Sequence, residues 1–467
     1  MRTGLVVVLL LWPAVRGLPA QEAPPEVASI PVPGDSARQE QSGAPGLPPW
    51  RQHEPAVART LVEITFINLV AAGINSIARE IRSPTLGTWW ENMQGGWEWD
   101  PNMIRVNHFE HPWAGAAYFN SARANGLSFW GSAPMALTGS LMWELYGEAK
   151  PPSINDLLST TLTGVALGEP LRRLSLIVVD EEAGGVDRLW REAFTFLVNP
   201  GLGLNRLSRG QSWSRRENPP GRHPDVLAGG IGAGLRHFVP SDGAGFQSSL
   251  VSLAVEYGDP FAAGARDPFS SFSSTMELLT SSPDGLGSLN ARGLLAAFGV
   301  GDQETNRLGG VFMEFDYRLD GAVEFAQQSF GVGLLTRAGP GDGFRFITDV
   351  SAEAVPILAV GDAYAKPLTG RRYDYGAGVG ARALARVEHR GRRLVWAGGR
   401  AYWGPTLNGA SATKAVQLAS VDARLPLVWS MSLGATYQFY RQGSTYDDRA
   451  TEIQRVGSLS LFLSTEH

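Results

Sequence analysis

A strict two-residue alternation in the C-terminal half of the chain is the feature that most limits how it can fold. Residues 310–319 place apolar side chains at every second position and mostly charged side chains between them: Val311, Met313, Phe315, Tyr317 and Leu319 against Phe312, Glu314, Asp316 and Arg318. Residues 429–440 show the same pattern. Successive side chains of a β-strand point to opposite faces, so each segment predicts a strand with one apolar face. We expect the apolar face to meet lipid.

Alternating runs recur elsewhere in this half, separated by turn signals such as Ser-Asp-Gly and Ser-Pro-Asp-Gly. They lie near residues 226–238, 246–258, 270–280, 288–300, 323–337, 343–357, 373–388, 392–403, 413–426 and 455–466. With the two strands above they make about 12 segments, each near the roughly 9–11 residues that a tilted membrane strand needs. Only a closed barrel satisfies every backbone hydrogen bond of a sheet inside lipid. The pattern therefore predicts an antiparallel transmembrane β-barrel, with a soluble β-sandwich as the alternative.

Composition agrees with a membrane protein and excludes several function classes. The chain has 56 Gly and 14 Trp but only 18% charged residues, a bias that suits membrane β-structure. A net charge of -5 provides no basic face, so we expect no nucleic-acid partner. The absence of cysteine excludes disulfides, thiolate metal sites and an acylated lipoprotein N-terminus.

The N-terminus has the features of an export signal. Arg2 precedes an apolar run over residues 4–12, and residues 18–20 offer a small-residue cleavage point. The run is too short to span a bilayer, so we expect a cleaved signal peptide over residues 1–20, with an uncleaved anchor as the alternative. Export together with a β-barrel predicts a location in the outer membrane of a Gram-negative cell.

The mature chain divides into four parts by composition. Residues 21–55 are rich in Pro, Gln and Ser and predict a disordered tether. Residues 56–205 have helical periodicity and predict a helical domain, residues 206–224 form a polar linker, and residues 225–467 form the barrel. The fold class is therefore α+β, with an N-terminal helical domain followed by an antiparallel transmembrane barrel.

Four segments of the helical domain have start or stop signals. They are residues 56–82, the segment from His111-Pro112 to Asn125-Gly126, residues 128–146, and a helix that follows Ser153 and ends at Pro170. Small and polar residues form stripes on the last three. Packing these stripes together predicts a buried polar cluster, made of Tyr118, Asn120, Arg123, Glu144, Ser153, Asn155, Asp156 and Glu169. A buried carboxylate needs a cation, and Arg123 is the nearest candidate for Glu144.

The polar cluster can be interpreted as a site for acid–base or acyl-transfer chemistry on a lipid. The candidates are His108 or His111 as base, Ser132 or Ser140 as nucleophile, and Glu144 or Asp156 as the group that orients the base. There is no Gly-x-Ser-x-Gly elbow and no His-Glu-x-x-His motif, so we assign no catalytic residue and expect no metal and no cofactor. The alternative is structural, because Ser153 and Asp156 have the spacing of a capping box at a helix start.

One stretch, over about residues 90–210, carries a distinctive order and spacing of residues. These are His111-Pro112, Tyr118, Asn120, Arg123, Glu144, Ser153, Asn155-Asp156, Gly164 and Gly168-Glu169. The stretch resembles a bacterial envelope family known as domain of unknown function 3943. The resemblance implies an exported protein whose helical domain precedes an outer-membrane β-region, and it implies no known activity. His111, Glu144 and Asn155-Asp156 are also similar in order to residues of small VanZ-like envelope proteins, a similarity that implies an arrangement and not a reaction.

Two function classes follow. We expect the helical domain at the periplasmic mouth of the barrel or inside it as a plug. The first class is an outer-membrane channel, transport or structural protein of unknown ligand, with a lumen lined by Glu314, Asp316, Arg318, Arg382, Arg386 and Asp422. The second is a lipid-modifying or lipid-handling enzyme that uses the polar cluster. The expected partners are outer-membrane lipid and, during biogenesis, the barrel-assembly machinery, and the sequence leaves the oligomeric state open.

Overall fold

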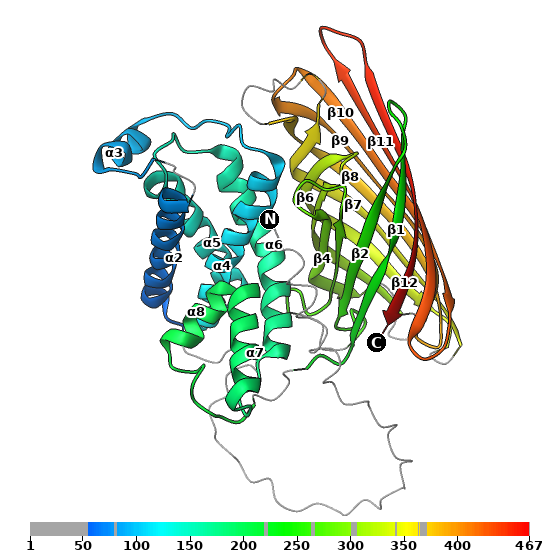
Figure 1. The fold of residues 1–467 in the computed structure, drawn as a ribbon, viewed down its shortest axis with the longest axis horizontal. Coiled ribbons are helices and arrows are strands. Elements are labelled where there is room, and N and C mark those ends of the chain that lie inside the picture. The colour runs from blue at the N-terminus through cyan, green and yellow to red at the C-terminus, as the bar shows by residue number, and fades with distance from the viewer. Residues whose placement is uncertain are drawn as a thin grey trace, which may run out of the picture.

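The computed structural model describes residues 55–78, 82–218, 223–262, 267–299, 306–340, 343–362, 364 and 371–466. The predicted signal peptide, residues 1–20, and all but the last residue of the predicted tether lie outside these residues. The described chain forms a helical bundle and a β-barrel that lie side by side (Figure 1).

The C-terminal half folds into a closed antiparallel barrel in which each strand pairs with its neighbours in sequence. The described strands are β1 (Leu227–Pro240), β2 (Phe246–Tyr257), β3 (Phe272–Leu279), β4 (Leu286–Gly299), β5 (Arg307–Leu319), β6 (Glu324–Ala338), β7 (Phe344–Gly361), β8 (Tyr373–His389), β9 (Arg392–Asn408), β10 (Ala412–Pro426), β11 (Met431–Tyr446) and β12 (Glu452–Glu466). The cylinder closes where β1 pairs with β12, for example Leu235 with Leu461. Each strand lies over one of the predicted alternating runs. The predicted fold class is confirmed.

The N-terminal half is helical. Its described elements are α2 (Val57–Ala78), α3 (Leu86–Gln94), the π-helical turn η1 (Val106–Glu110), α4 (His111–Ala124), α5 (Phe129–Met142), the π-helical turn η2 (Trp143–Gly147), α6 (Ile154–Val178), α7 (Gly185–Val198) and α8 (Pro200–Ser208). The last helix ends at Ser208 and the first strand begins at Leu227, on either side of the polar linker.

Local signals explain where the central helices begin. Pro112 occupies the first turn of α4, where its missing N–H costs nothing. The hydroxyl of Ser153 accepts a hydrogen bond from the Asp156 N–H at 3.2 Å and caps α6. The prediction that Pro170 ends this helix is wrong, because α6 continues to Val178. Proline removes one intrahelical bond, and residues beyond it such as Leu174 pack against the hydrophobic core, which offsets that loss.

Helices α4 and α6 cross with their backbones in contact. Gly115 of α4 lies against Gly164 of α6, and a Cβ added to Gly164 would lie 2.7 Å from the Cα of Gly115. Small residues at a helix crossing let two backbones approach this closely. The contact fixes the relative position of the two helices that carry His111 and Asp156.

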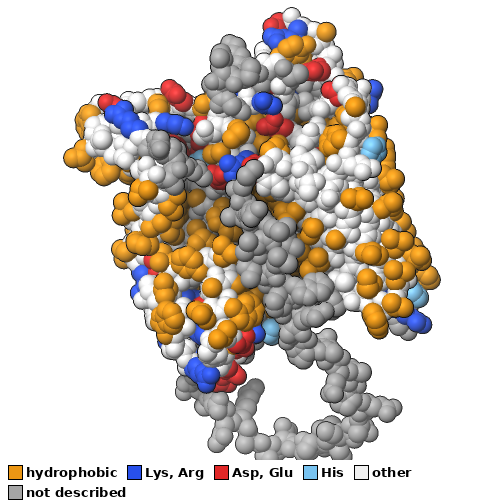
Figure 2. All heavy atoms as spheres, viewed as in Figure 1, with side chains coloured by type: hydrophobic (Ala, Val, Ile, Leu, Met, Phe, Trp, Pro, Cys, Tyr) orange, Lys and Arg blue, Asp and Glu red, His pale blue; other side chains and the backbone are white. Residues whose placement is uncertain are grey.

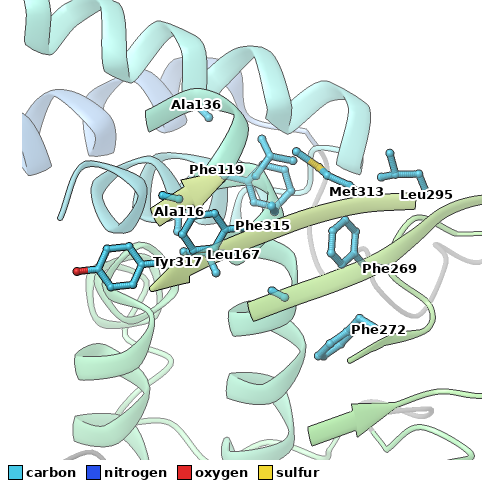
Figure 3. Close-up of a cluster of buried hydrophobic side chains, with 14 of the residues drawn as sticks. Ala116, Phe119, Ala136, Leu167, Phe269, Phe272, Leu295, Met313, Phe315 and Tyr317 are labelled. Carbon is cyan, nitrogen blue, oxygen red and sulfur yellow. The ribbon is translucent and has the colours of Figure 1, made fainter. Parts of the chain in front are cut away.

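The helical bundle packs on the outer wall of the barrel. Phe315 of β5 is buried in one core with Phe119 of α4 and Leu167 of α6, as Figure 3 shows. The preceding residue, Glu314, accepts a hydrogen bond from Arg400 of β9. Because β9 lies four strands away from β5, that bond crosses the barrel interior, so Phe315 points outward. The expectation of a plug inside the barrel is wrong.

The alternation of β5 therefore serves a different purpose from the one expected. Its apolar face contacts helices, whereas residues 310–319 were expected to present that face to lipid. The expectation holds for β11, where Leu433 is 46% exposed and Tyr437 is 51% exposed on the outer face. The period of two is the same in both strands, because it records which face is apolar and not what covers that face.

The helical bundle presents an apolar exterior of its own (Figure 2). Helix α2 is long and apolar enough over residues 57–77 to cross a membrane, with a mean hydropathy of 1.6 and only 22% of that window buried. Its exposed side chains include Val62, Phe66, Leu69 and Ile74. Exposed apolar surface of this extent is typical of a protein that contacts lipid or another protein.

Candidate functional site

Ionisable side chains from separate elements meet at the N-terminal end of α6. Asp100 comes from the loop after α3, His111 begins α4, Glu144 lies in η2, and Asp156 lies in the first turn of α6. Ligand atoms of Asp100, His111 and Asp156 lie within 4.8 Å of one another. We call the four residues the carboxylate–histidine site.

Two π-helical turns bring His111 and Glu144 to the site. Turn η1 leads directly into His111, and η2 extends α5 so that it carries Glu144. A π-turn adds a residue to a helical turn, re-aims the side chains on it, and recurs at functional sites. The Oε2 atom of Glu144 accepts a hydrogen bond from the Ser153 N–H at 2.7 Å, so Glu144 lies beside the capped start of α6.

Amide side chains hold the two aspartates. Asn102 donates to the Asp100 carboxylate from its backbone N–H at 2.9 Å. Asn155 accepts from the Asp100 N–H at 2.7 Å and donates from Nδ2 to Oδ1 of Asp156 at 2.8 Å. The other oxygen of Asp156, Oδ2, faces Nε2 of His111 at 3.8 Å. The geometry orients both carboxylates toward the histidine.

The carboxyl groups of the site are buried without a strong cation. Asp100, Glu144 and Asp156 are 7%, 3% and 2% exposed. Within the described residues their one ion-pair contact is with His111. Burial, and then the charge of Asp156, raises the pKa of Glu144 well above its usual value. Burial, and then the adjacent Asp100 carboxylate, does the same to the pKa of Asp156. The site therefore favours a proton or a cation among its carboxylates.

The outer face of the barrel forms the rear wall of the site. Asn107 donates from Nδ2 to the hydroxyls of Tyr373 and Tyr375 at 3.0 and 3.1 Å. Asn155 also donates to Tyr375, at 3.0 Å. Both tyrosines begin β8, so the barrel positions the amides that in turn position the aspartates.

His108 lies behind the site and does not reach solvent. It is 1% exposed, and burial together with the nearby His111 lowers its pKa to about 3. Its Nδ1 lies 3.4 Å from the Ser159 hydroxyl, and its Nε2 has no hydrogen-bond partner within the described residues. His108 is a neutral, enclosed imidazole, which leaves His111 as the histidine of the site with access to a ligand.

A cavity of about 340 Å³ opens beside His111. It is lined by polar residues on one side and by apolar α2 residues on the other, including His111, Tyr118, Glu148, Lys150, Ala71 and Ile74. Arg82 and Lys150 add positive charge to its lining. A cavity of this size accepts a small ligand or the headgroup of a larger one.

The predicted polar cluster is buried but divides into two groups. Glu144, Ser153, Asn155 and Asp156 belong to the carboxylate–histidine site. Tyr118 lines the cavity, and its hydroxyl donates to Asn68 of α2.

Arg123, Asn120 and Glu169 form the second group, in the middle of the bundle. Arg123 donates to both oxygens of Glu169 at 2.8 and 3.1 Å, so the expectation that it pairs with Glu144 is wrong. Burial alone would raise the pKa of Glu169, but Arg123, Arg173 and Arg172 lower it to about 2. Glu169 comes four residues before Arg173 on the same helix, and that spacing could have suggested its arginine partners.

The predicted serine nucleophiles lie elsewhere. Ser132 and Ser140 are 0% and 1% exposed, and neither borders the cavity. Four residues that build the site were not predicted from the sequence: Asp100, Asn107, Tyr373 and Tyr375. Asp100 ends the Trp-rich loop and carries no motif, and the tyrosines lie more than 200 residues away on a strand. The one usable signal was the paired Tyr373 and Tyr375 on a single strand face.

The predicted lumen residues form hydrogen bonds and ion pairs, and Glu314, Asp316, Arg318, Arg382 and Arg386 bond across the barrel. Arg400 donates to Glu314 at 3.0 Å and to Asp316 at 2.7 Å, and Arg382 donates to Glu314 at 3.1 Å. Arg318 reaches Gln438 of β11 at 3.2 Å. The remaining two residues of the set, Arg386 and Asp422, pair with Glu256 and Arg424. Side chains from opposite walls therefore meet within the barrel.

Comparison with known proteins finds a family match in the helical region. A family described as "Domain of unknown function (DUF3943)" matches residues 96–201, which include the whole carboxylate–histidine site. No curated protein matches the chain. Among solved structures, the outer membrane channel DcaP of Acinetobacter baumannii has 8% identity and a TM-score of 0.24, covering 52% of this chain and 96% of that chain. A loop L8 deletion mutant of OmpT, an outer membrane protein of Vibrio cholerae, has 10% identity and a TM-score of 0.22, covering 52% and 98%. The helical region of this chain is thus similar to a family without an assigned activity.

Proposed function

We propose that this protein is an outer-membrane enzyme that hydrolyses an ester or phosphoester bond of a phosphate-bearing lipid at the carboxylate–histidine site. The observation that carries the proposal is the cluster of buried carboxylates around His111, because His111 lines a cavity that residues of helix α2 also line. Active sites are the places where burial and like charges are combined in this way.

Two apolar surfaces of the molecule, on the barrel and on helix α2, support access of a lipid to the site. The outer faces of β8 to β12 expose apolar side chains, and α2 exposes apolar side chains beside the cavity. In a barrel with an even number of strands, the first strand begins and the last strand ends on the same side of the membrane. For an exported chain this is the periplasmic side. Strand β8 begins with Tyr373 and Tyr375 on the opposite side of the membrane. The site therefore lies toward the outer leaflet. Lipids of that leaflet are the substrates that the cavity can reach.

The cavity lining holds two basic side chains that can bind an anionic headgroup, together with the acidic Glu110 and Glu148. Arg82 and Lys150 are both exposed and line the cavity with His111. Cationic side chains bind phosphate through charge-assisted hydrogen bonds, while apolar residues of α2 can contact acyl chains.

The reaction needs water as its only co-reactant. Glu144 is placed to accept a proton from a water molecule, whose oxygen then bonds to the carbonyl carbon or phosphorus of the lipid. The ester C–O or P–O bond breaks, and the leaving oxygen takes a proton from a protonated carboxyl or imidazole of the site. Burial raises the pKa of both Glu144 and Asp156, which favours their protonated forms and suits a carboxyl that gives a proton to the leaving oxygen.

The barrel interior gives less support to a wide channel. Arginines of β8 and β9 bond to carboxylates of β5 across the lumen. Arg386 and Arg393 likewise both bond to Glu256 of β2. Large solutes would have to break these pairs to pass.

The test uses the full-length protein purified in detergent and reconstituted into vesicles. One vesicle type holds phospholipid and the other holds phospholipid with lipopolysaccharide, and mass spectrometry follows deacylated or dephosphorylated products. We expect the wild type to form product and Glu144→Gln to lose at least tenfold in rate, while Glu182→Gln, an exposed glutamate of the same bundle, stays at the wild-type rate. Equal product from the wild type and Glu144→Gln, or none from the wild type on either vesicle, contradicts the proposal.

A further inference from the structure

We propose that Asp100, His111 and Asp156 bind a divalent transition-metal cation, with Zn²⁺ or Mn²⁺ as the ions that fit the ligand set. The site rests on geometry and charge, and only the use of the ion rests on the proposed lipid hydrolysis. The sequence predicted no metal, because the three ligands come from separate elements and form no spaced motif.

The distances suit a shared ion better than direct bonding. Nε2 of His111 and Oδ2 of Asp156 are 3.8 Å apart, too far for a hydrogen bond. Two atoms that ligate one ion at about 2.1 Å lie roughly 3–4 Å apart. The ligand atoms of Asp100, His111 and Asp156 all lie within 4.8 Å of one another, so a small contraction around an ion completes the set.

The charge and burial of the site also favour a bound cation. Asp100 and Asp156 are at most 7% exposed, and within the described chain the only basic side chain in an ion-pair contact with them is His111. Two adjacent carboxylates removed from water need a proton or a cation between them. A divalent ion satisfies both carboxylates and fills the gap to the imidazole.

Glu144 provides a second, independent indication. Its carboxylate is 3% exposed, and Oε1 has no hydrogen-bond partner within the described residues. The other oxygen is held by the Ser153 N–H, next to the Asp156 turn, and the charges of Asp156 and His111 both act on Glu144. An unpartnered buried oxygen on a residue held at the start of α6 would suit the base that takes a proton from an ion-bound water.

Neighbouring amides orient the ligands as metal sites require. Asn155 occupies Oδ1 of Asp156 at 2.8 Å and leaves Oδ2 for the ion. Tyr375 of the barrel in turn accepts a hydrogen bond from Asn155 at 3.0 Å. Such supporting contacts fix the geometry of carboxylate and histidine ligands.

The ligand set also favours a catalytic ion over a structural one. Three protein ligands leave at least one coordination position open, and His111, with its side chain 12% exposed, borders the cavity. One imidazole with two carboxylates suits Zn²⁺ or Mn²⁺ better than Ca²⁺, which prefers oxygen ligands alone.

The test measures metal binding directly. The full-length protein in detergent is stripped with EDTA, desalted and equilibrated with Zn²⁺ or, separately, Mn²⁺, and bound metal per chain is measured by plasma mass spectrometry. We expect the wild type to bind one of the two ions stoichiometrically and His111→Ala and Asp100→Asn to lose at least tenfold in affinity. His237→Ala, an exposed histidine of β1, is the matched control and keeps wild-type binding. Heat-modified migration on a gel reports whether each variant retains its barrel.

The outcomes separate this inference from the proposed function. Binding by the wild type that does not exceed that of folded His111→Ala and Asp100→Asn overturns the metal site. Lipid turnover that persists undiminished in stripped protein overturns the catalytic use of the ion, while leaving the hydrolase standing. Metal binding that depends on His111 and Asp100, in a protein that forms no lipid product, supports the site and overturns the hydrolase.

Discussion

The barrel lumen and the carboxylate–histidine site both bury carboxylates almost completely but compensate them in opposite ways. In the lumen, Glu314 is 1% exposed and contacts three arginines, Arg292, Arg382 and Arg400. At the start of α6, Asp156 is 2% exposed, and within the described residues its one ion-pair contact is with the imidazole of His111 at 3.8 Å. The same chemical group is therefore a cross-link in one region and an uncompensated charge in the other.

The difference teaches where function resides. A buried ion pair offsets part of its desolvation cost and fixes the relative positions of the two elements that it joins. A buried carboxylate without a cation adds no such stabilisation to the folded state. Such a group is retained where a ligand or a reaction uses it. The lumen network therefore stabilises the barrel, and the outer-wall site is where we propose that a ligand or substrate binds.

The largest expected effect comes from breaking the lumen network. Glu314→Gln leaves the three arginines around it with less compensating charge, so we expect the free energy of unfolding to fall by about 3–5 kcal/mol. Urea unfolding in lipid vesicles, followed by heat-modified gel migration, measures it. Asp448→Asn, in an exposed pair with Arg449, is the control and should leave stability nearly unchanged, because solvent screens that pair. Equal effects of the two changes on the free energy of unfolding would mean that the lumen network stabilises the barrel no more than an exposed ion pair does.

The second effect tests the junction between the two regions. Phe315 is fully buried between β5 and the helices, and Phe315→Ala removes that ring, so we expect a loss of about 3–4 kcal/mol. Tryptophan fluorescence during urea unfolding should show the helical bundle separating from the barrel at lower urea. Leu461→Ala removes an exposed side chain on the lipid face and should leave this transition in place. An unchanged transition in Phe315→Ala would contradict the packing of the bundle on the outer wall.

Strand order and fold class could be predicted because they depend on local patterns. A period of two, turn residues and strand lengths of membrane size together specify a barrel without any knowledge of long-range contacts. Pro112 and Ser153 likewise marked two helix starts, because capping acts within one turn.

The placement of the bundle and the make-up of the site could not be predicted, because both depend on contacts distant in sequence. The apolar face of β5 looks the same whether lipid or a helix covers it, and only the fold shows that Phe119 packs against Phe315. Arg123 was predicted to pair with Glu144, but it donates to Glu169, which lies 46 residues further along the chain. Asp100 joins His111 and Asp156 only after the loop following α3 folds back onto α6.

The third change is expected to raise the free energy of unfolding, whereas Glu314→Gln is expected to lower it. Glu144 is a buried carboxyl without a cation, so Glu144→Gln removes a charge that burial disfavours and should raise the free energy of unfolding by about 1–2 kcal/mol in metal-stripped protein. Glu192→Gln is the matched control, since Glu192 pairs with Arg206 at 2.7 Å and its loss should lower stability. Urea unfolding followed by far-UV circular dichroism measures both. A loss of stability in both variants would remove the distinction between paired and unpaired carboxylates.

The smallest effect tests how the barrel supports the site. The Tyr375 hydroxyl accepts hydrogen bonds from Asn107 and Asn155, and each amide keeps another partner when the hydroxyl is removed. We therefore expect Tyr375→Phe to cost only about 0.5–1 kcal/mol in stability. The same change frees Asn155 to shift Asp156, so metal affinity or lipid turnover should fall by more than that stability loss predicts. Tyr257→Phe, whose ring stacks on Phe272 at the edge of the same interface, should change neither quantity. If both tyrosine variants keep full affinity and turnover, the barrel wall only holds the helices in place and takes no part in orienting the site.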